Sequence, residues 1–230
     1  MGSKRAAPEK KIAELTRKTN LSKEMVQRLV ANWQAKCKDK GLDRDTMRGD
    51  LMNEFNMLDD FILDRIFRTF DVSATGLHLK MEDYVLGMAK FLKGTPEEQR
   101  KFCFDVYDLN GDGYITREEV MHLLKNSVVQ KSIEDDDEEG TKDLTDLILK
   151  KLDCDDHDGR VSFKDFCTAV QGDKLLMESL GQCLPAEEHK QKYLKMLGQT
   201  EATNQPPSVS RTQSNRSQTK QSKAVQRRQD

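Results

Sequence analysis

The chain has 230 residues, of which 36% are hydrophobic and 34% are charged, so its apolar fraction is low. Those values suit a helical, highly solvated protein, or a folded core diluted by polar tails. A formal net charge of −2 provides no global field for nucleic acid or a membrane, and we expect neither as a partner. No apolar run approaches the ~18 residues that cross a bilayer, and we expect no signal peptide.

Five cysteines are present, an odd number, and none belongs to a CxxC pair. We therefore expect reduced thiols and a location in the cytoplasm. No nucleophile–base pair and no phosphate-cradling loop is found in the sequence. These observations predict that the protein is not an enzyme.

The chain begins with a basic stretch and continues as consecutive helices. Residues 1–12 are rich in Lys and Arg and lack an apolar face, so we expect a loose basic arm over residues 1–20. From Leu21 to about Leu180, apolar residues recur at helical spacing. Strand-like alternation is confined to short fragments, so the predicted fold class is all-α.

An internal repeat runs through the helical region. Helix, short glycine-containing loop and helix recur around residues 41, 76, 113 and 159. This spacing predicts four EF-hands in two pairs. The predicted domains are an N-terminal pair at residues 21–94, a C-terminal pair at 95–172, C-terminal helices at 173–198 and a tail at 199–230.

The composition changes after Gly198. Gln, Ser, Thr, Asn and Arg dominate through Asp230, and such a segment buries too little surface to offset its ordering entropy. We therefore predict a disordered basic tail. It either solvates the protein or tethers it electrostatically to an acidic polymer such as a tubulin surface or nucleic acid.

The segment just before this tail predicts one more amphipathic helix, outside the last hand. Apolar residues recur between Leu175 and Leu180. Two roles are open: the helix occupies a groove between the hands and is displaced by a partner, or it caps the domain.

The third loop carries the spacing of a calcium site. Calcium is a hard cation that takes several oxygen ligands, and a 12-residue loop delivers them from positions 1, 3, 5, 7, 9 and 12. Gly113 at the sixth position permits the sharp turn, and Ile115 at the eighth is expected to bridge to the neighbouring loop. The predicted ligands are Asp108, Asn110, Asp112, Tyr114 through its carbonyl, Thr116 and Glu119.

The loop around Gly159 departs from this spacing by one residue. Counting back from Val161 as the bridge residue puts Cys154 first and Asp165 twelfth, whereas the entering helix is phased for Asp153 to be first. If the loop bulges, Asp153 replaces Cys154 as a ligand. Asp165 is shorter than Glu, so this loop tolerates Mg²⁺ better than the third loop does. Its candidate ligands are Asp153, Cys154, Asp156, Asp158, Arg160, Ser162 and Asp165.

The loop from Asp71 shows the same slip with fewer carboxylates. If Asp71 is first, Glu82 is twelfth but the bridge position is His78; if Leu79 is the bridge, Asp83 is twelfth. Either register predicts a structural hand with at most weak metal binding. Its candidate ligands are Asp71, Ser73, Thr75 and Glu82.

The first loop, at residues 35–46, has no oxygen-rich series, and only Gly41-Leu42 keeps the loop's shape, so we expect no metal there. Because odd and even hands pair through their bridge residues, the N-terminal pair is expected to be constitutive and the C-terminal pair to respond to calcium. Calcium would draw Glu119 inward, swing the exiting helix and expose an apolar groove. We expect little change in the helices around Leu29 and Phe67.

Several segments resemble the calaxin family, ciliary calcium sensors of the neuronal-calcium-sensor type that regulate outer-arm dynein. The resemblance runs from about Leu21 to Pro185 and implies dynein heavy chain, the outer-arm docking complex and the doublet microtubule as partners, with a location in the axoneme of a cilium or flagellum. Two loops depart from the family by an inserted residue. The segments are Asp64-Arg-Ile-Phe67, Phe104-Asp-Val-Tyr-Asp-Leu-Asn-Gly-Asp-Gly113, Leu123-Leu-Lys-Asn-Ser127, the acidic linker before Gly140, Lys142-Asp-Leu144 and Cys183-Leu-Pro185.

Two other functions compete with this one. A regulatory subunit like calcineurin B, controlling a phosphatase or kinase, would place a long amphipathic partner helix in the groove. A passive calcium buffer needs several intact loops, which the slipped loops argue against.

Overall fold

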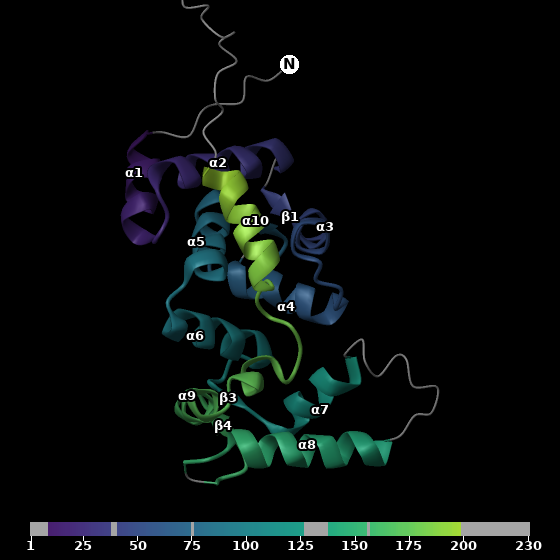
Figure 1. The fold of residues 1–230 in the computed structure, drawn as a ribbon. Coiled ribbons are helices and arrows are strands. Elements are labelled where there is room, and N and C mark those ends of the chain that lie inside the picture. Colours follow the sequence, from purple (N-terminus) through teal and green to yellow (C-terminus); the bar gives the residue numbers. More distant parts are fainter. Residues whose placement is uncertain (1–8, 38–40, 75, 127–137, 156, 199–230) are drawn as a thin grey trace, which may run out of the picture. The chain divides into compact units, whose positions relative to one another are not determined.

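Helices joined by short loops and two-residue strands make up the described part of the protein (Figure 1). The structure is a computed structural model that describes residues 9–37, 41–74, 76–126, 138–155 and 157–198. These all belong to one unit, residues 1–199, and a second unit spans residues 200–230. The predicted tail at 199–230 lies outside the described residues, as do residues 1–8.

The first two hands form the N-terminal pair. Asp43 and Asp59 cap α3 and α4, because their carboxylates accept hydrogen bonds from free amides of the first helical turn. The strands pair antiparallel with Leu42 opposite Leu79, and both side chains are fully buried. The elements are α2 (Lys23–Lys36), β1 (Leu42–Asp43), α3 (Arg44–Phe55), α4 (Asp60–Phe70), β2 (His78–Leu79) and α5 (Met81–Lys93).

The last two hands form the C-terminal pair in the same way. Thr95 and Glu98 make a capping box at the start of α6, and Ile115 pairs with Val161 across the bridge. Both bridge residues are fully buried, which confirms the prediction of an all-α fold with four EF-hands in two pairs. The elements are α6 (Pro96–Tyr107), β3 (Tyr114–Ile115), α7 (Arg117–Asn126), α8 (Glu138–Leu152), β4 (Val161–Ser162) and α9 (Phe163–Gly172).

The loose arm expected at the N-terminus is wrong from residue 9 onward. Residues Glu9–Lys18 form helix α1, in which Ile12 and Leu15 are buried. This helix packs against α2 and α5. Two apolar residues three apart are enough to dock a short helix when a neighbouring face is available, although they make a weak pattern in the sequence.

The C-terminal segment contacts both pairs of hands. A short 3₁₀ helix, η2 (Lys174–Glu178), packs against α9 and α6, and Tyr107 donates its hydroxyl to the carbonyl of Gly181 at 2.6 Å. The predicted helix at 175–180 is therefore a 3₁₀ turn that covers the C-terminal pair.

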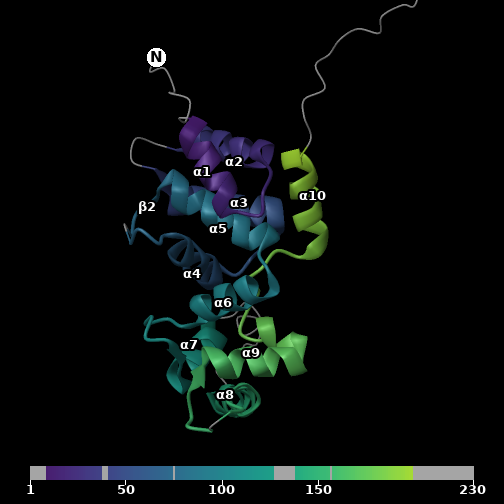
Figure 2. The same ribbon diagram turned by 90° about the vertical axis from the view of Figure 1, so that its left-hand side faces the viewer.

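A further helix, α10 (Glu187–Gly198), lies beside α2 and α3 (Figures 1 and 2). Its Tyr193 ring packs against that of Phe55 in a tilted arrangement, with 4.9 Å between the ring centroids. The C-terminal chain thus covers part of each pair. None of the helices in the described residues combines the length and apolarity that a bilayer crossing requires.

Candidate metal centre

The loop between α6 and α7 buries a carboxylate at each of its two ends. Asp108 is 6% exposed and Glu119 is 7% exposed. Gly111 and Gly113 have φ angles of 77° and 90°, a conformation that costs glycine little and other residues more. The glycines therefore let the loop turn around the side chain of Asp108.

The side-chain oxygens at the first, third and fifth positions lie against the loop backbone. Asp108 accepts hydrogen bonds from the amides of Gly111 at 2.7 Å and Gly113 at 2.9 Å. Asn110 accepts one from the Asp112 amide at 2.8 Å. Asp112 in turn accepts one from Tyr114, at 2.9 Å. The order of these oxygens along the loop is the one that the sequence predicts for calcium ligands.

Glu119, in the first turn of α7, reaches both ends of the loop. Its Oε1 accepts hydrogen bonds from the amides of Leu109 at 2.8 Å and Asn110 at 3.0 Å. Its Oε2 accepts bonds from the amide and the hydroxyl of Thr116, at 2.9 and 3.0 Å. One carboxylate therefore connects the exiting helix to the start of the loop.

The donor set of this loop fits calcium. Carboxylates, an amide, a hydroxyl and a backbone carbonyl are hard oxygen ligands, which calcium prefers. Across the described residues, no three His, Cys, Asp or Glu side chains converge closely enough to hold a metal ion as they stand. The residues that would hold the ion are Asp108, Asn110, Asp112, Tyr114, Thr116 and Glu119.

The loop between α8 and α9 contains one extra residue before its glycine. Asp153 accepts a hydrogen bond from the Gly159 amide at 2.9 Å, as Asp108 does from Gly113, but across six residues instead of five. His157 takes up the extra residue with a φ of 55°. The first position of this loop therefore belongs to Asp153.

Cys154 is rejected as the first ligand of this loop. Its thiol points to the carbonyl of Asp165, with a donor–acceptor distance of 3.5 Å. Burial raises the pKa of that thiol, which keeps it protonated. In contrast, Oδ1 of Asp153 is buried and receives no hydrogen bond from the described residues, as expected of an oxygen that faces a cation. Asp156 lies outside the described residues.

Asp165 occupies the place of Glu119, with one bond from the start of its loop where Glu119 has two. It accepts bonds from the amide of Asp155 at 2.8 Å and the hydroxyl of Ser162 at 2.6 Å. Burial alone would raise its pKa, but these hydrogen bonds outweigh burial and lower it, so the carboxylate is ionised. Asp158 pairs with Arg160 at 2.8 Å, and this hydrogen bond lowers the pKa of Asp158.

The loop after α4 has its extra residue on the other side of the glycine. Asp71 accepts a hydrogen bond from the Gly76 amide at 2.6 Å, five residues ahead. The bridge residue Leu79, however, is three residues beyond that glycine, whereas Ile115 is two beyond its own. The residue four positions after the bridge is therefore Asp83. It is 6% exposed, and its Oδ2 has no hydrogen-bond partner among the described residues.

Glu82 is wrong as the twelfth ligand of this loop. Its carboxylate bonds Lys11 of α1 at 2.5 Å and Lys18 at 3.3 Å, away from the loop. Ser73 is exposed, and Thr75 lies outside the described residues. This loop therefore keeps the shape of an EF-hand loop but gathers few carboxylates.

Two arginines near these loops make contacts that the sequence did not predict, although Arg160 is among the candidate ligands of the fourth loop. Arg160 lies over the ring of Tyr114, 4.3 Å from its centroid, which ties the two C-terminal loops together beside their bridge. Arg65 of α4 is buried against the start of the third loop. A charged residue between Ile62 and Ile66, on an apolar helix face, was the available signal for Arg65.

Comparisons with known proteins agree with this geometry. The protein-family model that describes an EF-hand domain pair matches residues 97–171 of this chain. Calaxin from Xenopus laevis is 51% identical over 146 residues, covering 64% of this chain and 69% of the relative. Human calaxin is 45% identical over 153 residues, covering 66% and 72%. Guanylyl cyclase-activating protein 1 from Lithobates pipiens is 31% identical over 122 residues, covering 53% and 58%.

Proposed function

The chain belongs to the calaxin family of EF-hand proteins, and from that premise we propose that it is a calcium sensor that regulates or docks outer-arm dynein on ciliary doublet microtubules. The proposed partners are dynein heavy chain, the outer-arm docking complex and the doublet, in the axoneme of a cilium or flagellum. Support for them comes from the family resemblance of the segments quoted above. The loop Asp108–Glu119, with its two buried carboxylates, is the observation that carries the calcium part.

The third loop is the proposed primary calcium site. The bound ion supplies the positive charge that lets the loop carboxylates approach one another. Glu119 stands in the first turn of α7, so drawing its carboxylate toward Asp108 moves that helix. The fourth loop, with Asp153 and Asp165, is proposed as a weaker site that tolerates Mg²⁺.

A binding experiment on salt-washed axonemes tests the function. We would measure co-sedimentation of the full chain with calcium and with chelator, for the wild type, Glu119→Gln and Glu118→Gln. Glu118 is the matched control, because it is the exposed neighbour of Glu119. Calcium should change binding for the wild type and Glu118→Gln and leave Glu119→Gln unchanged. Axoneme binding that ignores calcium in all three proteins would refute the sensor function.

A regulatory subunit like calcineurin B predicts a different result. Such a protein would retain a phosphatase or kinase from a ciliated-cell lysate, and it would do so through a long helix that inserts between its hands. In the described structure the chain's own α10 lies on α2 and α3 of the N-terminal pair. Calcium-dependent recovery of a phosphatase instead of dynein would favour this rival.

A further inference from the structure

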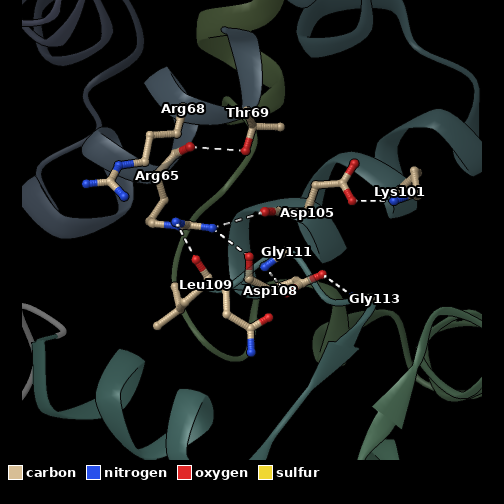
Figure 3. A pocket seen from close by; sticks show the side chains of 10 residues that line it. Arg65, Arg68, Thr69, Lys101, Asp105, Asp108, Leu109, Gly111 and Gly113 are labelled. Carbon is tan, nitrogen blue, oxygen red and sulfur yellow. Dashed lines mark hydrogen bonds and ion pairs between the residues drawn. The ribbon is translucent and has the colours of Figure 1, made fainter. Parts of the chain in front are cut away.

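Helix α4 of the N-terminal pair holds a buried arginine against the calcium loop of the other pair (Figure 3). Arg65 is 9% exposed, and its guanidinium donates four hydrogen bonds to backbone carbonyls. The acceptors are Val106 at 3.0 Å, Leu109 at 3.1 Å, Asp105 at 3.5 Å and Asp108 at 2.6 Å. All of them lie in the last turn of α6 or the first two positions of the loop.

Two of these carbonyls, those of Asp105 and Val106, belong to the last turn of α6, and that of Asp108 belongs to its C-cap residue. The last four C=O groups of an α-helix lack intrahelical donors and carry the negative end of the helix dipole. A planar guanidinium can serve several of them at once. Asp108 is consequently held on two sides, since Arg65 bonds its carbonyl while loop amides bond its carboxylate.

The same face of α4 also contacts other parts of the third hand, which consists of α6, its loop and α7, and the segment after α9. The ring of Phe61 lies 5.1 Å from that of His122 on α7, the exiting helix. Ile62 lies close to Gly181: a Cβ added at Gly181 would lie 2.8 Å from Cγ1 of Ile62. Helix α4 therefore contacts the entering helix, the exiting helix and the C-terminal segment.

We propose that Arg65 is a positioning residue of the calcium loop, and that through it calcium binding at Asp108–Glu119 is transmitted to α4. The inference rests on the proposed calcium site and deepens it. By fixing the start of the loop, Arg65 lowers the number of residues that the ion must order. Because coupling is reciprocal, the bound ion must then tighten the contact between α4 and the loop.

The charge of Arg65 works against calcium, and this makes the sign of the effect informative. A guanidinium repels the ion, so removing the charge alone would tighten calcium binding. Losing the four carbonyl bonds would weaken it, because the loop start must then be ordered on binding. Arg65→Lys keeps the charge and loses the planar fork, which separates the two effects.

Calorimetry on the full chain tests the positioning role. We expect Arg65→Gln and Arg65→Lys to raise the calcium Kd by about 5- to 30-fold, the factor for ordering one more residue. Arg68→Gln is the matched control, since this half-exposed neighbour pairs with Asp64, and its Kd should stay near that of the wild type. An unchanged or lower Kd in both Arg65 variants would overturn the proposal.

Hydrogen exchange tests the positioning role both without calcium, in chelator, and with calcium bound. In chelator, both Arg65 variants should exchange faster than wild type at the amides of Leu109–Gly113. Calcium should slow exchange in α4 of the wild type, and this slowing should be lost in Arg65→Lys even if Arg65→Gln fails to fold.

The two proposals fail in different ways. A wild type without calcium binding refutes the proposed function, yet the exchange comparison in chelator still decides on positioning. A wild type that binds calcium while its loop and α4 behave like those of the Arg65 variants refutes the inference alone.

Discussion

The N-terminal and C-terminal pairs are built on the same apolar plan and differ in where their acids lie. Each pair joins two hands through fully buried bridge residues, Leu42 with Leu79 and Ile115 with Val161. In the C-terminal pair, the residue four positions after each described bridge accepts bonds from its own loop. In the N-terminal pair, the residue four positions after Leu79 is Asp83, and Oδ2 of its carboxylate has no hydrogen-bond partner among the described residues. Glu82, the residue before it, forms an ion pair with Lys11 of α1.

This comparison separates what makes a hand from what makes a metal site. The apolar bridge and the helix faces survive an inserted residue, because the loop takes it up in its backbone. Ligand chemistry does not survive equally well, since each oxygen must reach one point. We therefore propose that the N-terminal pair is a scaffold and that the C-terminal pair responds to calcium.

Removing a bridge residue should give the largest effect. Leu79→Ala and Ile115→Ala each leave a cavity in a closed core and should lower the free energy of unfolding by about 2–5 kcal/mol. Leu79→Ala should leave the calcium Kd within about threefold of wild type, as expected of distant sites. Urea unfolding in chelator, followed by calorimetry, measures both quantities. Equal losses of calcium affinity in the two variants would erase the distinction between the pairs.

Glu119→Gln should weaken the tightest calcium site by about 100-fold, to the weak end of the sensor range of ~10⁻⁷–10⁻⁵ M or beyond it. The amide cannot provide the bidentate carboxylate that connects α7 to Leu109 and Asn110. Calorimetry checks this, with Glu118→Gln as the control. If the tightest binding survives the substitution, the site lies elsewhere.

Two substitutions at adjacent positions, Asp153→Asn and Cys154→Ser, test which residue is the first ligand of the fourth loop. Asp153→Asn should weaken the second, weaker site by about 10-fold, the scale of losing one charge-assisted ligand. Cys154→Ser should leave that site unchanged, because the thiol faces the carbonyl of Asp165. Titration with calcium and then Mg²⁺ distinguishes them. A larger loss of metal affinity in Cys154→Ser than in Asp153→Asn would indicate that Cys154, and not Asp153, is the first ligand.

Glu82→Gln should have the smallest effect. The ion pairs with Lys11 and Lys18 are partly solvent-exposed, so their loss should cost roughly 0–1 kcal/mol of stability. The hydrogen bond from Lys11 lowers the pKa of Glu82; this contribution is therefore present above the unfolded-state pKa and lost as pH falls through the folded one. Urea unfolding at neutral and acid pH measures it. Any change in calcium Kd would indicate that Glu82 is a ligand of the loop after α4 and would contradict this assignment.

The third loop could be predicted from the sequence because ligands, glycine and bridge residue share one register. The fourth could be predicted only in part, since the disagreement between its two helix phases indicates an inserted residue but not where the chain absorbs it. The hydrogen bond from the Gly159 amide to Asp153 and the positive φ of His157 show that Asp153 is first. Helix α1 was missed because its two buried residues are meaningful only beside α2 and α5.

Arg65 marks a different limit of sequence reasoning. The carbonyls that it bonds are some 40 residues away in the chain, as with Val106 at a separation of 41. No local pattern specifies such a partner. It also changes one expectation: Phe67 was expected to stay nearly unchanged on calcium binding, but it lies on α4, the helix that touches the calcium hand.

Hydrogen exchange with calcium and with chelator, with Mg²⁺ present in both, tests the central claim most directly. The account predicts that calcium alters protection in α6, α7, α8 and α9, and in α4 around Arg65. Helix α2 around Leu29 should keep its protection. Equal changes in α2 and α7 would mean that the N-terminal pair also binds calcium or that both pairs respond as one, and would contradict the division described here.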